Sequence, residues 1–249
     1  MSEPRIRLGI LTPSSNTVLE PVTQAMLAGL PGVSAHFARF RVTEIALSPE
    51  ALAQFDDSAI LQAAELLADA RVDVIGWSGT SGGWLGFEAD RRLCQRITAI
   101  TGIPATTSML ALNEALALTG VRRLGLVTPY RDDLQARIIA NYATLGVDCR
   151  AERHLGLQEN FAFAEVTEAT VEGMVREVAA EAPEAIAVVC TNLRGAPLVA
   201  RLEAELGLPI YDSAATVVWK ALHMAGSGMA GMTGWGALFS LPAGEDRPC

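Results

Sequence analysis

Short apolar runs alternate along the chain with longer stretches in which apolar residues recur at helical spacing. Apolar runs without polar alternation are typical of strands buried on both faces of a parallel sheet, and the stretches between them predict helices. Residues 34–41 alternate apolar and polar side chains, which also predicts a strand. We expect strands at residues 7–13, 34–41, 72–78, 102–107 and 123–129, and helices at residues 17–30, 49–70, 86–100 and 108–118. This order of elements indicates an α/β fold.

The pattern begins again near Gly120. Residues 123–129 repeat residues 7–13 with five of seven positions identical. The Gly-Ile-Pro of residues 102–104 recurs as Gly-Leu-Pro at residues 207–209. Matches at successive strands in the same order indicate a duplicated unit.

The repeat predicts two similar parallel-sheet α/β halves related by pseudo-two-fold symmetry. The first half comprises residues 1–118 and the second half residues 119–218, and we expect residues 219–249 to pack back on the first half. Residues 74–80 align with residues 185–191, so Gly79 stands opposite Cys190 in the repeat. Two facing halves place equivalent strand ends on opposite sides of a cleft, which is a common ligand site.

Charge and composition narrow the range of partners. The net charge of −9 argues against binding to nucleic acid or to an anionic membrane. The amino terminus has no apolar signal core, and no apolar run is long enough to span a bilayer. The four cysteines lack metal-ligand spacing, and no glycine-rich nucleotide fingerprint is present. We expect a reduced, cytoplasmic protein without metal or cofactor that acts on a small molecule, and a homo-oligomer is left open.

Cys190 is the central candidate for chemistry. It follows the apolar run Ala185–Val189 and is therefore expected at the carboxyl end of a buried strand, where open α/β sheets bind ligands. We interpret it as a catalytic proton carrier. The alternative is a structural cysteine, since free cysteines are among the most buried residues.

Neutral hydrogen-bond donors gather at the other expected strand ends. Their hydroxyl, amide and backbone N–H groups suit a carboxylate, or the enediolate that forms when a carboxylate loses a neighbouring carbon substituent. Trp77 and Trp84 flank the glycine-rich turn and are expected either in the core or as a wall of the pocket. The candidate substrate-binding residues of this group are Ser14, Asn16, Gly79, Thr80, Ser81, Tyr130, Thr191 and Asn192.

These features resemble the aspartate/glutamate racemase superfamily, in the branch that contains arylmalonate decarboxylase and maleate cis-trans isomerase. The resemblance extends over essentially the whole chain. Racemases and isomerases of this kind use one cysteine in each half, whereas this chain has Gly79 at the first position. Arylmalonate decarboxylases similarly have Gly-Thr-Ser there and a single cysteine in the second half. The resemblance implies that Thr80, Ser81 and Tyr130 hold a retained carboxylate and that Cys190 protonates the enediolate.

Other positions resemble the isomerase. The stretch Pro13–Asn16 and the residue Asn160 are similar to isomerase motifs, and the resemblance implies that Asn16 and Asn160 hold a substrate carboxylate. Addition of a thiolate to a double bond, or exchange of a proton on two faces of carbon, needs a second acid or base that Gly79 cannot supply. One thiol suffices for decarboxylation followed by protonation.

We therefore expect a cofactor-independent decarboxylase of a substituted malonate or related dicarboxylic acid. One alternative is a maleate-type isomerase or an Asp/Glu-type racemase whose second acid or base lies elsewhere. Another is a carboxylate-binding protein without catalytic activity.

Overall fold

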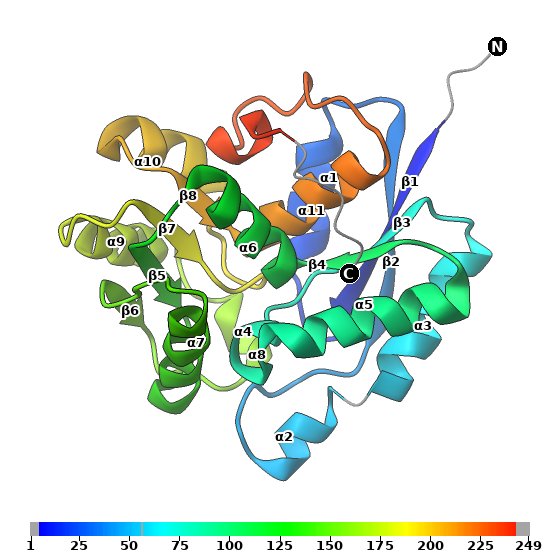
Figure 1. The fold of residues 1–249 in the computed structure, drawn as a ribbon, viewed down its shortest axis with the longest axis horizontal. Helices are drawn as coiled ribbons and strands as arrows, with labels where there is room; N and C mark the ends of the chain where they lie inside the picture. The colour runs from blue at the N-terminus through cyan, green and yellow to red at the C-terminus, as the bar shows by residue number, and fades with distance from the viewer. Residues whose placement is uncertain (1–4, 56, 243–249) are drawn as a thin grey trace.

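Two four-stranded parallel sheets form the centre of the computed structural model, which describes residues 5–55 and 57–242 (Figure 1). The first sheet has the order β2-β1-β3-β4 and the second the order β6-β5-β7-β8, so equivalent strands occupy equivalent places. The expected pair of similar parallel-sheet halves is confirmed. The strands are β1 (Ile6–Pro13), β2 (Val33–Phe40), β3 (Val74–Trp77), β4 (Ala105–Thr107), β5 (Leu124–Thr128), β6 (Glu152–His154), β7 (Ala185–Val188) and β8 (Ile210–Asp212).

Burial on both faces explains the apolar runs. Every residue of β3, β5 and β7 is buried, because helices cover both sides of each sheet. All pairings within the named strands are parallel. The carboxyl ends of each sheet therefore lie along one edge, and the polar residues that follow the strands are brought together there.

The helices connect the strands and cover the sheets. They are α1 (Leu19–Leu27), α2 (Pro49–Ala53), α3 (Asp57–Asp69), α4 (Gly82–Leu85), α5 (Phe87–Thr101), α6 (Ser108–Thr119), α7 (Asp132–Thr144), α8 (Asn160–Phe163), α9 (Glu168–Ala179), α10 (Val199–Leu206) and α11 (Ser213–Met224). No helix among the described residues has both the length and the apolar character needed to cross a membrane.

The predicted helix at residues 49–70 is two helices, α2 and α3. The side chain of Gln54 turns back to the loop after β2, where its Oε1 accepts a hydrogen bond from the Thr43 N–H at 2.7 Å. Its amide nitrogen donates to the carbonyl oxygen of Glu44 at 3.1 Å. These bonds fix the residue at the end of α2 to a different segment, so a continuous helical spacing in the sequence does not give a continuous helix.

Helix α11 crosses from the second sheet to the first. It follows β8 in the chain but packs against α6, β3 and β4 (Figure 1). The Thr216 hydroxyl donates to the Ser108 carbonyl oxygen at 2.9 Å, and Lys220 pairs with Glu114 at 2.9 Å. A Cβ at Gly76 would lie 2.6 Å from Cγ2 of Val217, so only a glycine in β3 lets the helix approach this closely.

The segment after α11 contacts both halves. Its Gly231 backbone lies against the backbone of Gly29 at the end of α1. Further along, the Ala237 N–H donates to Glu203 Oε2 of α10 at 2.8 Å. Cys249 lies outside the described residues. The boundaries drawn at residues 118 and 218 stay predictions.

Candidate active site

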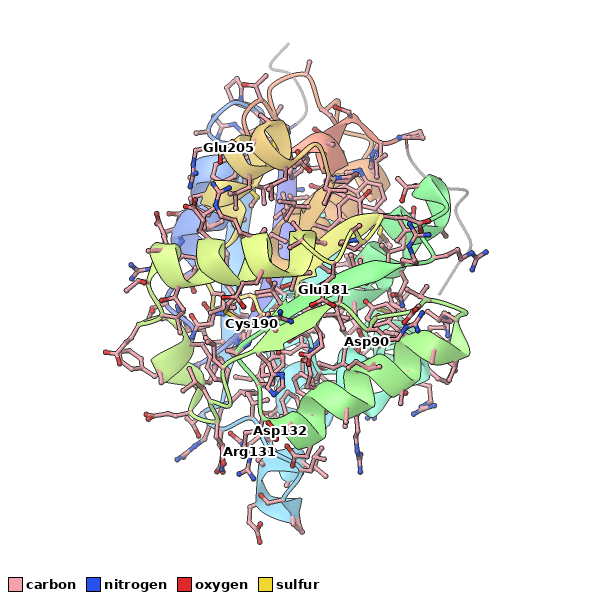
Figure 2. All side chains as sticks on the ribbon, turned by 90° about the vertical axis from the view of Figure 1, so that its left-hand side faces the viewer. Asp90, Arg131, Asp132, Glu181, Cys190 and Glu205 are labelled. Atoms are coloured by element: carbon pink, nitrogen blue, oxygen red, sulfur yellow. The ribbon has the colours of Figure 1, made fainter. Side chains whose placement is uncertain are left out.

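A pocket of about 300 Å³, open at its mouth, lies where the carboxyl ends of the two sheets face each other. Figure 2 shows Cys190 toward the middle of the molecule, whereas Glu205 and Asp132 lie toward its periphery. Both tryptophans that flank the glycine-rich turn line the pocket. Its walls are made by Pro13, Val42, Ile45, Phe55, Trp77, Gly79, Thr80, Ser81 and Trp84 from the first half, and by Tyr130, Asn160, Cys190 and Thr191 from the second.

Cys190 follows β7 directly after Val189, and 3% of it is exposed. Burial raises the pKa of its thiol to about 12. Hydrogen bonds to the sulfur from the Tyr130 hydroxyl and from the backbone N–H groups of Asn192 and Leu193 lower the pKa, but burial dominates. The group at this strand end is therefore a neutral thiol at neutral pH, which can donate a proton.

Tyr130 joins the two walls of the pocket. Its hydroxyl lies 2.6 Å from Oγ1 of Thr80 and also hydrogen-bonds Cys190. The ring is held edge-on by Trp84 and Phe163, at centroid distances of 5.2 Å and 5.6 Å. Burial raises the pKa of the phenol well above its ordinary value, so this group also remains protonated.

The turn after β3 supplies further donors. Ser81 Oγ accepts a hydrogen bond from the Trp77 indole nitrogen at 3.2 Å, which leaves the Ser81 O–H available as a donor. Thr80, Ser81 and Tyr130 thus present three hydroxyls beside the thiol. No lysine, arginine or histidine stands among the described residues that line the pocket, so an anion bound here would be held by neutral donors.

Behind the pocket, polar side chains tie the two halves together. Asn16 Nδ2 donates to Oγ1 of Thr191 at 3.1 Å, and Thr191 donates to the Ser78 carbonyl oxygen at 3.2 Å. Asn192 Oδ1 accepts from the Thr17 N–H at 3.1 Å, and Asn160 Nδ2 donates to Ser15 Oγ at 2.8 Å.

The same side chains also shape single segments. Asn16 Oδ1 accepts from the N–H groups of Val18 and Leu19 at 2.9 Å and 3.0 Å and so fixes the loop that leads into α1. The Asn192 amide donates to the Asn160 carbonyl oxygen at 2.6 Å within the second half. Ser14 Oγ accepts from the Val42 N–H at 3.2 Å and positions the loop after β2.

The structure divides the predicted site residues into two groups. Seven line the pocket together: Gly79, Thr80, Ser81, Tyr130, Asn160, Cys190 and Thr191. The other three, Ser14, Asn16 and Asn192, stand outside the lining and are engaged in the hydrogen bonds just described. The roles assigned to all ten stay predictions.

One titratable residue near the site was not indicated by the sequence pattern. Asp212 ends β8, is 1% exposed and caps α11 through a hydrogen bond from the Ala214 N–H to Oδ1 at 2.8 Å. Its Oδ2 has no hydrogen-bond partner among the described residues. Burial raises the pKa of this carboxyl to about 7, and its negative charge raises the pKa of Cys190. The signal available in the sequence was its place in the repeat, where it stands opposite Thr107.

Comparison with known proteins identifies related enzymes. The family model described as arylmalonate decarboxylase matches residues 10–239. A maleate isomerase of Pseudomonas putida is 28% identical over 87% of this chain and 90% of its own length. An arylmalonate decarboxylase of Bordetella bronchiseptica is 33% identical over 56% of this chain and 59% of its own length.

A solved structure shares the fold over most of the chain. It is a cysteine-to-serine variant of the Nocardia farcinica maleate cis-trans isomerase with a covalently bound succinylcysteine intermediate. The two structures superpose with a TM-score of 0.84 at 25% identity, over 94% of this chain and 98% of the other.

Proposed function

The chain belongs to the arylmalonate decarboxylase family, and from that premise we propose that it is a cofactor-independent decarboxylase of a substituted malonate or related dicarboxylic acid. The observation that carries the proposal is the asymmetry of the pocket. One wall, formed by Cys190 and Thr191, presents a protonated thiol. The facing wall, formed by Gly79, Thr80 and Ser81, presents hydroxyl donors and no acid or base.

The reaction uses the two walls in succession. The bond between the α-carbon and one carboxylate breaks, carbon dioxide leaves, and the electron pair passes to the retained carboxylate as an enediolate. Thr80 and Ser81 donate hydrogen bonds to the oxygens where this charge gathers, and Tyr130 turns its single O–H from the Cys190 sulfur to the same oxygens when the acid binds. Cys190 gives its proton to the α-carbon, and the thiolate then takes a proton from solvent. The sum is one proton consumed and one carbon dioxide released for each diacid.

The protonation state of the thiol favours this chemistry over addition to a double bond. A proton donor must begin the reaction as a thiol, whereas a nucleophile must begin it as a thiolate. Burial raises the pKa of Cys190 to about 12, and no cationic side chain among the described pocket residues opposes that shift.

The apolar side of the pocket supports loss of a carboxylate. Val42, Ile45 and Phe55 lie there with Trp84, and none offers a hydrogen bond to an anion except the indole nitrogen of Trp84. A carboxylate placed against these side chains loses its hydration, and its departure as neutral carbon dioxide relieves that cost.

A maleate-type isomerase is the second candidate. It is favoured by the maleate isomerases that match nearly their full length, and by Asn160 in the pocket lining. In this alternative Cys190 would add to the double bond as a thiolate, and another residue would supply the second acid or base.

An assay of the purified protein in D2O distinguishes the two candidates. The panel contains methylmalonate, phenylmalonate and maleate, with carbon dioxide and the products followed by NMR. A decarboxylase releases carbon dioxide and places one deuterium on the α-carbon of the product. Formation of fumarate from maleate without carbon dioxide release from any malonate would overturn the proposal in favour of the isomerase.

A further inference from the structure

Trp77 separates the candidate active site from a second pocket. This second pocket, of about 350 Å³, shares Phe55, Trp77 and Ser81 with the first. Its remaining walls are the apolar side chains of Phe40, Ile60, Leu85, Ala89 and Leu93, together with the buried carboxylate of Asp90. The indole of Trp77, with Phe55 and Ser81, therefore lies at the boundary between the substrate pocket and a second, mostly apolar space.

The same indole fills the place of a side chain at residue 79. A Cβ built on Gly79 would lie 2.1 Å from Cζ2, 2.3 Å from Cε2 and 2.6 Å from Cη2 of Trp77. These distances are far inside van der Waals contact. Gly79 is not among the glycines with positive φ, so its backbone conformation does not require glycine. The reason for a glycine here is the tryptophan ring.

The ring is fixed in this place from two sides. Its Nε1 donates to Ser81 Oγ at 3.2 Å, and its plane packs at a centroid distance of 5.0 Å against Phe40. Trp77 is 1% exposed, so a rotation of the ring would have to displace its neighbours in the core.

We propose that Trp77 is the specificity-determining residue of the site. Its indole excludes a second acid or base from position 79, and it limits the α-substituent of the diacid by closing the space behind the pocket. This inference rests on the proposed decarboxylase for its substrate class. The steric relation between residues 77 and 79 does not depend on which reaction the site performs.

A stability cycle tests the steric relation without any assay of activity. The four proteins are the native chain, Gly79→Ala, Trp77→Leu and the double variant; leucine keeps apolar bulk but removes the six-membered ring. We expect Gly79→Ala to lower the thermal midpoint by roughly 5 °C in the native background, because the added methyl group overpacks against the indole. In the Trp77→Leu background the same substitution should lower it by much less.

Gly173→Ala in α9 is the matched control, because no atom lies within 4 Å of a Cβ at that position. Its effect should be the same in both backgrounds. If Gly79→Ala lowered the thermal midpoint equally in the two backgrounds, the proposal would be overturned. The requirement for a glycine at position 79 would then not depend on Trp77.

The catalytic consequence is tested with a thiol at position 79. Gly79→Cys and Trp77→Leu/Gly79→Cys are compared for exchange of the α-hydrogen of the product acid in D2O. A second proton carrier on the facing wall should raise exchange by about tenfold or more in the double variant and leave the single variant near the native rate. An equal rise in exchange in Gly79→Cys alone would show that the Trp77 indole does not exclude an acid or base from position 79.

Substrate size gives the third comparison. Trp77→Leu should raise kcat/KM for phenylmalonate relative to methylmalonate by about tenfold, chiefly through KM, because it opens the second pocket to the substituent. An unchanged ratio overturns the size limit. If the native protein decarboxylates no malonate, the proposed function fails, and the stability cycle still decides whether Trp77 excludes a side chain from position 79.

Discussion

The loop after β3 and the loop after β7 occupy equivalent places in two sheets with the same strand order, but they carry different chemistry. The first loop offers Gly79 backed by the Trp77 ring, and its hydroxyls come from Thr80 and Ser81. The second offers the thiol of Cys190, which Tyr130 connects by hydrogen bonds to Thr80. The two strand ends occupy the same place in the repeated scaffold, and in the proposed function they have separate tasks, anion binding on one wall and proton donation on the other.

The largest expected effect comes from removing the Cys190 thiol, which leaves neither wall of the pocket with a sulfur atom. Cys190→Ala should lower kcat by about 10³-fold or more, because the proton donor is lost while the donors of the facing wall remain. Substrate binding, followed by isothermal titration calorimetry, should change little. A variant that keeps native turnover would show that the proton comes from another group.

The next comparison concerns the two residues that end β4 and β8. Thr107 accepts a hydrogen bond from the Leu110 N–H and caps α6, whereas Asp212 caps α11 with a carboxyl. Burial raises the pKa of Asp212 to about 7, above its ordinary value of about 3.9 in the unfolded chain. The folded protein therefore binds this proton more tightly than the unfolded chain does.

A pH series on Asp212→Asn measures that difference. In the native protein, the proton on Asp212 should contribute up to about 4 kcal/mol to the free energy of unfolding below about pH 4. This contribution should be lost as the pH rises to about 7. Asp212→Asn should abolish the loss and lower the pKa of Cys190, because the negative charge near the thiol disappears. Chemical denaturation at pH 5 and pH 8 checks the first point, and thiolate absorbance checks the second. The same pH dependence in both proteins would contradict the assignment.

The smallest effect on kcat is expected from removing the Tyr130 hydroxyl, which connects the two walls of the pocket. Tyr130→Phe removes the hydroxyl between Thr80 and Cys190, and kcat should fall by about 10- to 100-fold with a smaller change in KM. Tyr142→Phe is the matched control, since the buried Tyr142 hydroxyl has no hydrogen-bond partner among the described residues and lies outside the pocket lining. Equal kcat values for Tyr130→Phe and Tyr142→Phe would show that the Tyr130 hydroxyl does not contribute to catalysis.

The fold could be predicted because its signal repeats. The apolar runs at β1, β3, β5 and β7 are strong, and the match of residues 7–13 and 74–80 with residues 123–129 and 185–191 assigns each run to its half. The break between α2 and α3 could not be predicted, because it depends on a bond from Gln54 to a loop elsewhere in the fold. Helical spacing is local and does not report such a contact.

The site was predictable as far as position in the strand decides it. Cys190, Thr80 and Gly79 follow buried strands, and such residues meet at one edge of a parallel sheet. Which polar side chain lines the pocket depends on rotamer and packing, so Asn16 and Asn192, which do not line it, could not be separated from Asn160, which does.

The crossing of α11 has a consequence for how the molecule comes apart. This helix belongs to the second sheet by its place in the chain, yet it covers β3 and β4 of the first, and one continuous apolar cluster includes residues of both sheets. Fragments cut between the sheets would each expose a large apolar surface, so they should be recovered only by co-expression and reassembly. Cooperative unfolding in a single transition follows from the same interlocking, and exchange of one sheet for that of a distant relative would have to carry α11 with it.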